Sequence, residues 1–183
     1  MALIVNPDEL AQKRIFLILA TPGNIRQRNI DLIKEVSDLG YHTVVITANF
    51  PYSILTKLYG EQGVDLTKVS FIDAVTNNSI GSAKEIPGIV RFINNPANLT
   101  DMGIAVTEIL KERSEEKICI LFDSISTLLI YLPSQNISKF IHFVTNKLRL
   151  VDISGIFLAT EKGLDPMLMN QLTTFVDTVI DTG

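Results

Sequence analysis

The sequence predicts an α/β domain with a mostly parallel central sheet and helices on both of its faces. Short apolar runs alternate along the chain with longer stretches of helical period, which is the pattern of βαβ units. The apolar runs are continuous, as in strands that are buried on both faces. The 183 residues are 46% hydrophobic and 20% charged, which is typical of one packed domain. We therefore treat residues 1–183 as a single domain.

Six apolar runs have the length of strands. They are Ile15–Leu19, Val44–Thr47, Val69–Ile72, Ile118–Phe122, Ile156–Ala159 and Phe175–Ile180, with a short extra strand possible at Ile89–Ile93. Helical stretches fill the spaces between them. They are Ile25–Leu39, Pro51–Tyr59, Leu99–Arg113, Ile125–Tyr131 and Ile137–Val151. Gly40 stands where a left-handed helix end is expected, and Asp165-Pro166 is typical of a helix start.

Two segments lack this pattern. Residues 1–13 precede the first strand as an N-terminal extension, and residues 76–98 are rich in Asn, Gly and Pro. Such a long irregular insert inside a compact domain is either functional or partly mobile.

Composition excludes several classes of function. The net charge of −4, without a basic stripe, argues against nucleic-acid binding. One cysteine, Cys119, and two distant histidines cannot form a zinc site or a His-based metal cluster, and Cys119 is expected to be a buried hydrophobe. The chain shows no signal peptide and no apolar run of membrane-spanning length, so we expect no membrane association and a cytoplasmic location.

The turn after the first strand is the first candidate site, because open parallel sheets bind ligands beyond the carboxyl ends of their strands. A phosphate loop reads G-x-x-x-x-G-K-[ST], whereas this stretch reads Ala20-Thr21-Pro22-Gly23-Asn24-Ile25-Arg26-Gln27. The outer glycines, the lysine and the metal-binding hydroxyl are replaced by Ala20, Ile25, Arg26 and Gln27. Ile25 resists the positive φ that glycine supplies. An ordinary strand–helix turn and a residual anion site formed by Gly23, Asn24, Arg26, Gln27 and Arg28 both remain open.

Asp123 is the second candidate, since it follows an apolar strand. An Asp in this place can hold the water shell of Mg²⁺ in nucleotide hydrolases. It can equally cap the helix that starts at Ile125.

Several segments taken in order make the chain resemble RecA-superfamily P-loop ATPases, specifically the archaeal-type KaiC-like domains. They are the loop after the first strand, Val44–Thr47 before Pro51, Asp65–Asp73, Asn98–Asp101, Leu121–Ser124 and Val176–Ile180. The resemblance covers about Arg14 to Asp181 and implies a RecA-like fold.

That family places two adjacent glutamates at the end of its second strand, and one of them acts on the attacking water. The matching positions here are Ala48 and Asn49, and neither can act as a base. Glu161, after the strand Ile156–Ala159, could substitute, although a solvated loop glutamate is the simpler reading. With the Walker A pattern also degenerate, the resemblance implies no ATP hydrolysis, no catalytic residue and no resident cofactor or metal.

We therefore expect a pseudo-ATPase that acts as a regulatory or scaffold module through contacts with a protein partner or with itself. The alternative is a nucleotide- or anion-binding domain that keeps weak ATP and Mg²⁺ binding through Arg26 and Asp123.

Overall fold

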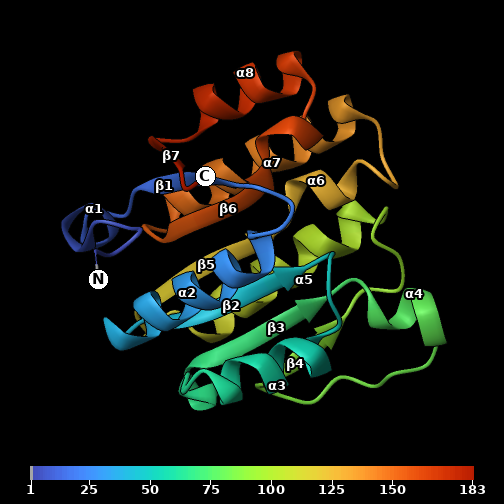
Figure 1. Cartoon of the computed structure of the whole chain (residues 1–183). Helices are drawn as coiled ribbons and strands as arrows, with labels where there is room; N and C mark the ends of the chain where they lie inside the picture. The colour runs from blue at the N-terminus through green and yellow to red at the C-terminus, as the bar shows by residue number, and fades with distance from the viewer. Residues whose placement is uncertain (1) are drawn as a thin grey trace.

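The computed structural model describes residues 2–183 and contains one seven-stranded sheet in the order β4-β3-β2-β5-β6-β1-β7 (Figure 1). All of its strand pairings are parallel. The strands are β1 (Ile15–Ala20), β2 (His42–Thr47), β3 (Val69–Asp73), β4 (Val90–Phe92), β5 (Ile118–Asp123), β6 (Ser154–Thr160) and β7 (Thr178–Asp181). The predicted fold class is confirmed.

Helices cover both faces of this sheet, because the crossover between two parallel strands must leave the sheet and return over it. The main helices are α2 (Ile25–Asp38), α3 (Tyr52–Glu61), α5 (Leu99–Glu112), α6 (Ile125–Leu128), α7 (Ser134–Leu150) and α8 (Pro166–Phe175). Helices α2 and α3 lie on one face, and α5, α7 and α8 on the other (Figure 1).

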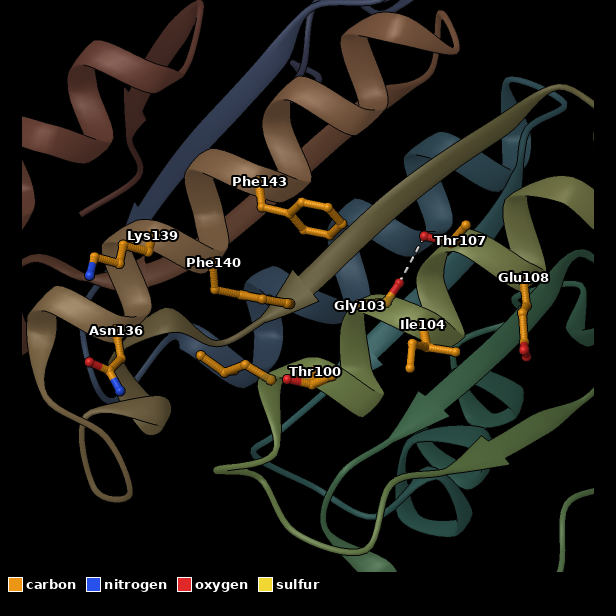
Figure 2. A pocket seen from close by; sticks show the side chains of 10 residues that line it. Thr100, Gly103, Ile104, Thr107, Glu108, Asn136, Lys139, Phe140 and Phe143 are labelled. Carbon is orange, nitrogen blue, oxygen red and sulfur yellow. Dashed lines mark hydrogen bonds between the residues drawn. The ribbon is translucent and has the colours of Figure 1, made fainter.

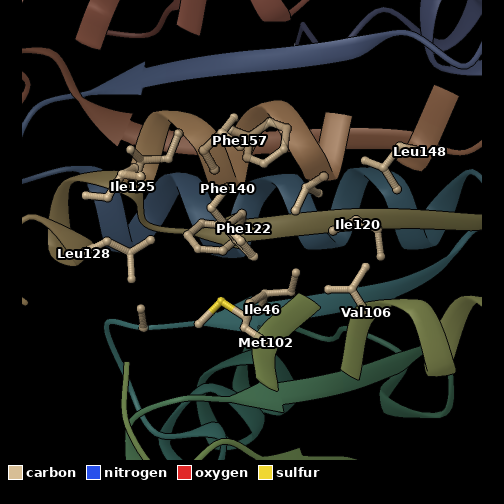
Figure 3. Close-up of a cluster of buried hydrophobic side chains, with 14 of the residues drawn as sticks. Ile46, Met102, Val106, Ile120, Phe122, Ile125, Leu128, Phe140, Leu148 and Phe157 are labelled. Atoms are coloured by element: carbon tan, nitrogen blue, oxygen red, sulfur yellow. The ribbon is translucent and has the colours of Figure 1, made fainter. Parts of the chain in front are cut away.

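Each strand supplies side chains to both cores, since successive residues of a strand point to opposite faces. In β1, Phe16 and Ile18 pack against α2 and α3, whereas Leu17 packs toward α7. The core on the α5–α7 face is aromatic at its centre, where Phe122 contacts both Phe140 and Phe157 (Figure 3).

The structure corrects the sequence prediction at both ends of the chain. The N-terminal extension contains a short helix, α1 (Pro7–Ala11), which Asn6 caps. Near the C-terminus, α8 continues to Phe175 and β7 begins at Thr178, so the last strand starts later than expected. The structure agrees with two other predictions. Gly40 follows α2 with a left-handed φ of 89°, and Asp165 caps the start of α8.

Segment 76–98 contains a short helix, α4 (Thr76–Ile80), and the edge strand β4. β4 pairs with β3, and a bridge from Ile86 to Val90 closes the turn before it. The segment therefore lacks helix and strand at residues 81–89 and 93–98.

No helix within residues 2–183 has the length and apolar character needed to cross a bilayer.

Candidate functional site

The carboxyl ends of β1, β2, β5 and β6 form the sheet edge where the sequence placed its candidate residues. β2 and β5 are in register at this edge, with Thr47 opposite Asp123, and Asp123 lies opposite Leu158 of β6. The backbone N–H of Ala48 donates to the carbonyl of Asp123, which extends the pairing past the end of β2.

The turn between β1 and α2 is short, and two of its backbone N–H groups are bonded within it. The carbonyl of Thr21 accepts the N–H of Asn24 at 2.9 Å and that of Ile25 at 3.0 Å. Asn24 is the N-cap residue, but its side chain donates to the carbonyl of Gly183 and not to the start of the helix. Gly23 and Asn24 are exposed. Two of the amides that a phosphate loop would offer to a ligand are thus already bonded within the turn.

The basic and amide side chains of this helix start already have partners within the protein. Arg26 is exposed and lies over the ring of Phe50, 5.9 Å from its centroid. Gln27 donates to Asp31 at 2.8 Å, and Arg28 contacts the same carboxylate at 3.2 Å. The two arginines therefore make different contacts, Arg26 with Phe50 and Arg28 with Asp31.

Asp123 is fully buried and lies in a polar network that links three elements. The side-chain amide of Asn29, on α2, donates to Asp123 Oδ2 at 2.7 Å. The hydroxyl of Tyr59, on α3, donates to Asn29 Oδ1. All three residues are buried, so the network is closed to solvent. Hydrogen bonds in such an environment are strong because little water screens them.

Burial raises the pKa of Asp123 to about 6, although the side chains of Asn29 and Asn49 act to lower it. Asn49 lies near the carboxylate, but Asp123 Oδ1 has no partner in hydrogen-bonding geometry within residues 2–183. Burial also raises the pKa of Tyr59 well above its ordinary value, and the adjacent Asp123 acts in the same direction. The network is therefore costly to ionise.

The alternative role of Asp123 as a helix cap is wrong. Ser124 is the N-cap of α6, and its hydroxyl accepts the N–H of Thr127. Asp123 is the last residue of β5, and its side chain turns back toward α2.

A second buried carboxylate, Asp73 at the end of β3, is surrounded by hydrogen-bond donors, unlike Asp123. It accepts the N–H groups of Tyr52, Val75 and Thr76 and the hydroxyl of Thr76. Asp73 thereby ties the start of α3 to the start of α4, which accounts for its burial.

The structure brings Asp123 next to Asn29, and no described hydrogen bond joins it to Gly23, Asn24, Arg26 or Gln27 within residues 2–183. Sequence reasoning missed Asn29 and Tyr59. A signal existed, because Asn29 shares the buried stripe of α2 with Ile33 and Val36. A polar residue in such a stripe needs a buried partner.

Glu161 is exposed, as the simpler reading expected. Next to it, Ser126 Oγ accepts the N–H of Thr160 at 2.8 Å and lies 3.1 Å from its hydroxyl. Gly163 packs against this pair, since a Cβ there would lie 2.6 Å from Thr160 Oγ1. Within residues 2–183 there is no group of three or more His, Cys, Asp or Glu side chains that could hold a metal ion.

A groove of about 820 Å³ lies away from this edge, between α5 and α7 (Figure 2). Its lining includes Leu99, Gly103, Ile104, Phe140 and Phe143. Ile104 is 51% exposed and Phe143 is 48% exposed, which is high for large apolar side chains. We call this the α5–α7 groove.

Residues 21–182 match the model of DUF7504, a family of unknown function. The chain belongs to this family. No curated protein matches it.

Two of the solved structures with a similar fold come from the archaeon Pyrococcus horikoshii. One is the uncharacterized protein PH0321 in complex with an unknown peptide, with a TM-score of 0.72, 13% identity and coverage of 93% of this chain and 78% of that one. Another is the KaiC-like protein PH0186, with a TM-score of 0.64, 14% identity and coverage of 93% and 72%. The DUF7504 domain thus has a KaiC-like, RecA-type fold, and at these identities the likeness concerns the fold alone.

Proposed function

We propose that this DUF7504 domain is a pseudo-ATPase, which keeps the KaiC-like fold and acts as a regulatory or scaffold module through contacts with other protein chains. The observation that carries the proposal is the closed turn after β1. A phosphate loop holds its ligand with free backbone amides, but here Thr21 accepts the N–H groups of Asn24 and Ile25.

The side chains of the turn do not fit a nucleoside triphosphate either. Arg26 stands where a phosphate loop has its lysine, and it lies over Phe50. Gln27 stands where the metal-binding hydroxyl belongs and bonds to Asp31 instead. These contacts support the proposal that the Walker A pattern is degenerate.

The remaining catalytic positions support the same proposal. Ala48 is buried and Asn49 is half-buried at the end of β2, where the resembled family has its glutamates, and neither can take a proton from water. Asp123 is engaged by Asn29 inside the protein. These three positions therefore support the proposal that the domain does not hydrolyse ATP.

Contacts with protein are supported by the α5–α7 groove, because large apolar side chains exposed along a groove are typical of interaction sites. The similar structure PH0321 is described in complex with a peptide, so a protein of this fold can hold one.

A nucleotide titration of the full chain tests the proposal. A ligand at 100 times its Kd stabilises a protein by about 2.7 kcal/mol, which corresponds to a rise in Tm of about 5–10 °C for a domain of this size. We expect no rise with ATP, ADP or GTP at millimolar concentration with Mg²⁺. A rise of that size would refute the pseudo-ATPase proposal.

One observation favours the alternative, a domain that retains weak ATP or anion binding. Asp123 Oδ1 is buried and unpartnered within residues 2–183, so the carboxylate keeps a free coordination position. If this reading is right, Mg²⁺ and ATP together raise the Tm, and both Arg26→Ala and Asp123→Asn abolish the rise. Arg91→Ala, a change of the same type at the far edge of the sheet, is the matched control and leaves the rise intact.

A further inference from the structure

We infer that the α5–α7 groove is the contact surface for a second copy of this chain, packed face to face about a two-fold axis that runs along the groove. The inference rests on the proposed function, of which it names the surface and the partner. It follows from the direction of the two helices, the charges that each carries and the register between them.

The two helices run in the same direction. Each is a crossover between parallel strands, α5 before β5 and α7 between β5 and β6, so both run antiparallel to the sheet. They contact each other near the middle of the groove, where Phe143 lies over Gly103 (Figure 2). A Cβ on residue 103 would lie 3.2 Å from the ring of Phe143, so glycine leaves room for this aromatic side chain.

The helices differ in charge. Helix α7 carries Lys139, Lys147 and Arg149 and no acidic residue. Helix α5 carries three acidic residues and one lysine. Arg149 is already paired with Asp177, whereas no ion pair within residues 2–183 involves Lys139 or Lys147 of α7. On α5, Glu108 and Glu112 contact Arg91 and still keep more than half of their side-chain surface exposed.

This difference selects the orientation of the second copy. A two-fold axis along the groove places α5 of each copy over α7 of the other, so that acidic helices face basic ones. An axis across the groove would place α7 over α7 and bring the lysines together, which is unfavourable.

The register then defines which charges meet. Taking the contact of Gly103 with Phe143 as the origin, Glu108 lies five residues further along α5, or about 7.5 Å, at the helical rise of 1.5 Å per residue. Lys147 lies four residues further along α7, or about 6 Å. Rotation about an axis along the groove leaves the position of every residue along that axis unchanged. Glu108 of one copy therefore faces Lys147 of the second copy, and the symmetry forms this pair twice.

Large apolar side chains are also exposed on these two helices. Ile104 and Phe143 are half exposed at the groove, and Leu150, further along α7, is 84% exposed. Packing two copies face to face removes them from water, which is the main favourable term in association.

The area fits a weak, reversible dimer. Helices of 14 and 17 residues are about 21 and 26 Å long and pack about 10 Å apart, so they present roughly 500 Å² per copy. The total of about 1,000 Å² is at the lower end of specific interfaces. We expect a dimer with a Kd on the order of 10–100 μM.

Sedimentation velocity on the full chain from 1 μM to 1 mM tests the inference. Lys147→Glu places two acidic groups face to face at both symmetric positions, and we expect it to raise the dimer Kd about tenfold or more. Adding Glu108→Lys restores the attraction and brings the Kd back to within about threefold of the wild type. Lys57→Glu, the same change on exposed α3 at the opposite face of the sheet, is the matched control and leaves the Kd unchanged.

Phe143→Ser gives a second, charge-independent arm, and the circular dichroism and Tm of every variant confirm that it folds. A chain that stays monomeric at 1 mM overturns the inference. So does a dimer that is insensitive to both Lys147→Glu and Phe143→Ser, since it must then use another face. Neither result affects the pseudo-ATPase proposal, which is refuted separately by a nucleotide-dependent rise in Tm.

Discussion

Replacing Asp123 with asparagine should stabilise the domain at neutral pH, although this residue is fully buried at a candidate site. The wild-type carboxyl has a pKa of about 6 in the folded protein against an ordinary value of 3.8, because burial disfavours its ionised form. The folded state therefore holds this proton more tightly than the unfolded chain does. The corresponding stabilisation is present below about pH 4 and is lost as the pH rises through 6.

The size of the effect follows from the difference between these pKa values. A shift of about 2.2 units corresponds to about 3 kcal/mol at 1.36 kcal/mol per unit. This is the cost of ionising Asp123 in the folded protein above pH 6. Asparagine removes the charge but keeps an oxygen that can accept the hydrogen bond from Asn29. We expect Asp123→Asn to gain about 1–3 kcal/mol at pH 8 and to change little at pH 4.

Urea unfolding between pH 4 and 8, followed by circular dichroism because the chain has no tryptophan, measures this difference. Asp73→Asn is the matched control, since Asp73 is equally buried but accepts bonds from four donors. An amide there turns an N–H group toward other donors, so this variant should lose about 1–3 kcal/mol. The reasoning fails if Asp123→Asn destabilises the protein at pH 8, or if its stability relative to wild type does not rise between pH 4 and 8.

Three further outcomes follow from contacts elsewhere in the fold. Glu35→Ala removes the carboxylate that accepts the backbone N–H groups of residues 4–5, so hydrogen exchange at those amides should become faster and the free energy of unfolding should fall by about 1–2 kcal/mol. Unchanged exchange would contradict a stabilising role of these hydrogen bonds. Gly163→Ala adds a Cβ only 2.6 Å from Thr160 Oγ1, and the Tm should fall by several degrees, whereas a neutral effect would mean that the turn yields easily. Burial raises the pKa of the Cys119 thiol to about 12, so a thiol reagent at pH 8 should label it only after the protein is unfolded in urea. Labelling of the folded protein would disprove this burial.

The sequence by itself determined the fold class, because its strongest signals are local. A continuous apolar run of only five residues, such as Ile118–Phe122, is typical of a strand that is buried on both faces, and the structure has β5 there. The start of α8 was equally predictable, since Asp165 supplies the capping oxygen and Pro166 lies at the first helical position, where the N–H group that proline lacks would have no partner in the helix. The departures of the first loop from the phosphate-binding pattern were also readable residue by residue.

Only the tertiary structure decided which of these residues meet. Asn29 and Asp123 are 94 residues apart, and their contact depends on β1 and β5 lying on either side of β6 with α2 packed across them. The α5–α7 groove likewise depends on the strand order, because that order sets which crossover helices are neighbours. A sequence pattern reports which face of an element is buried, but not which distant element covers it. For that reason Asp123 could be singled out from the sequence, and Asn29 could be recognised as a polar residue in a buried stripe, but the contact between them could not be predicted.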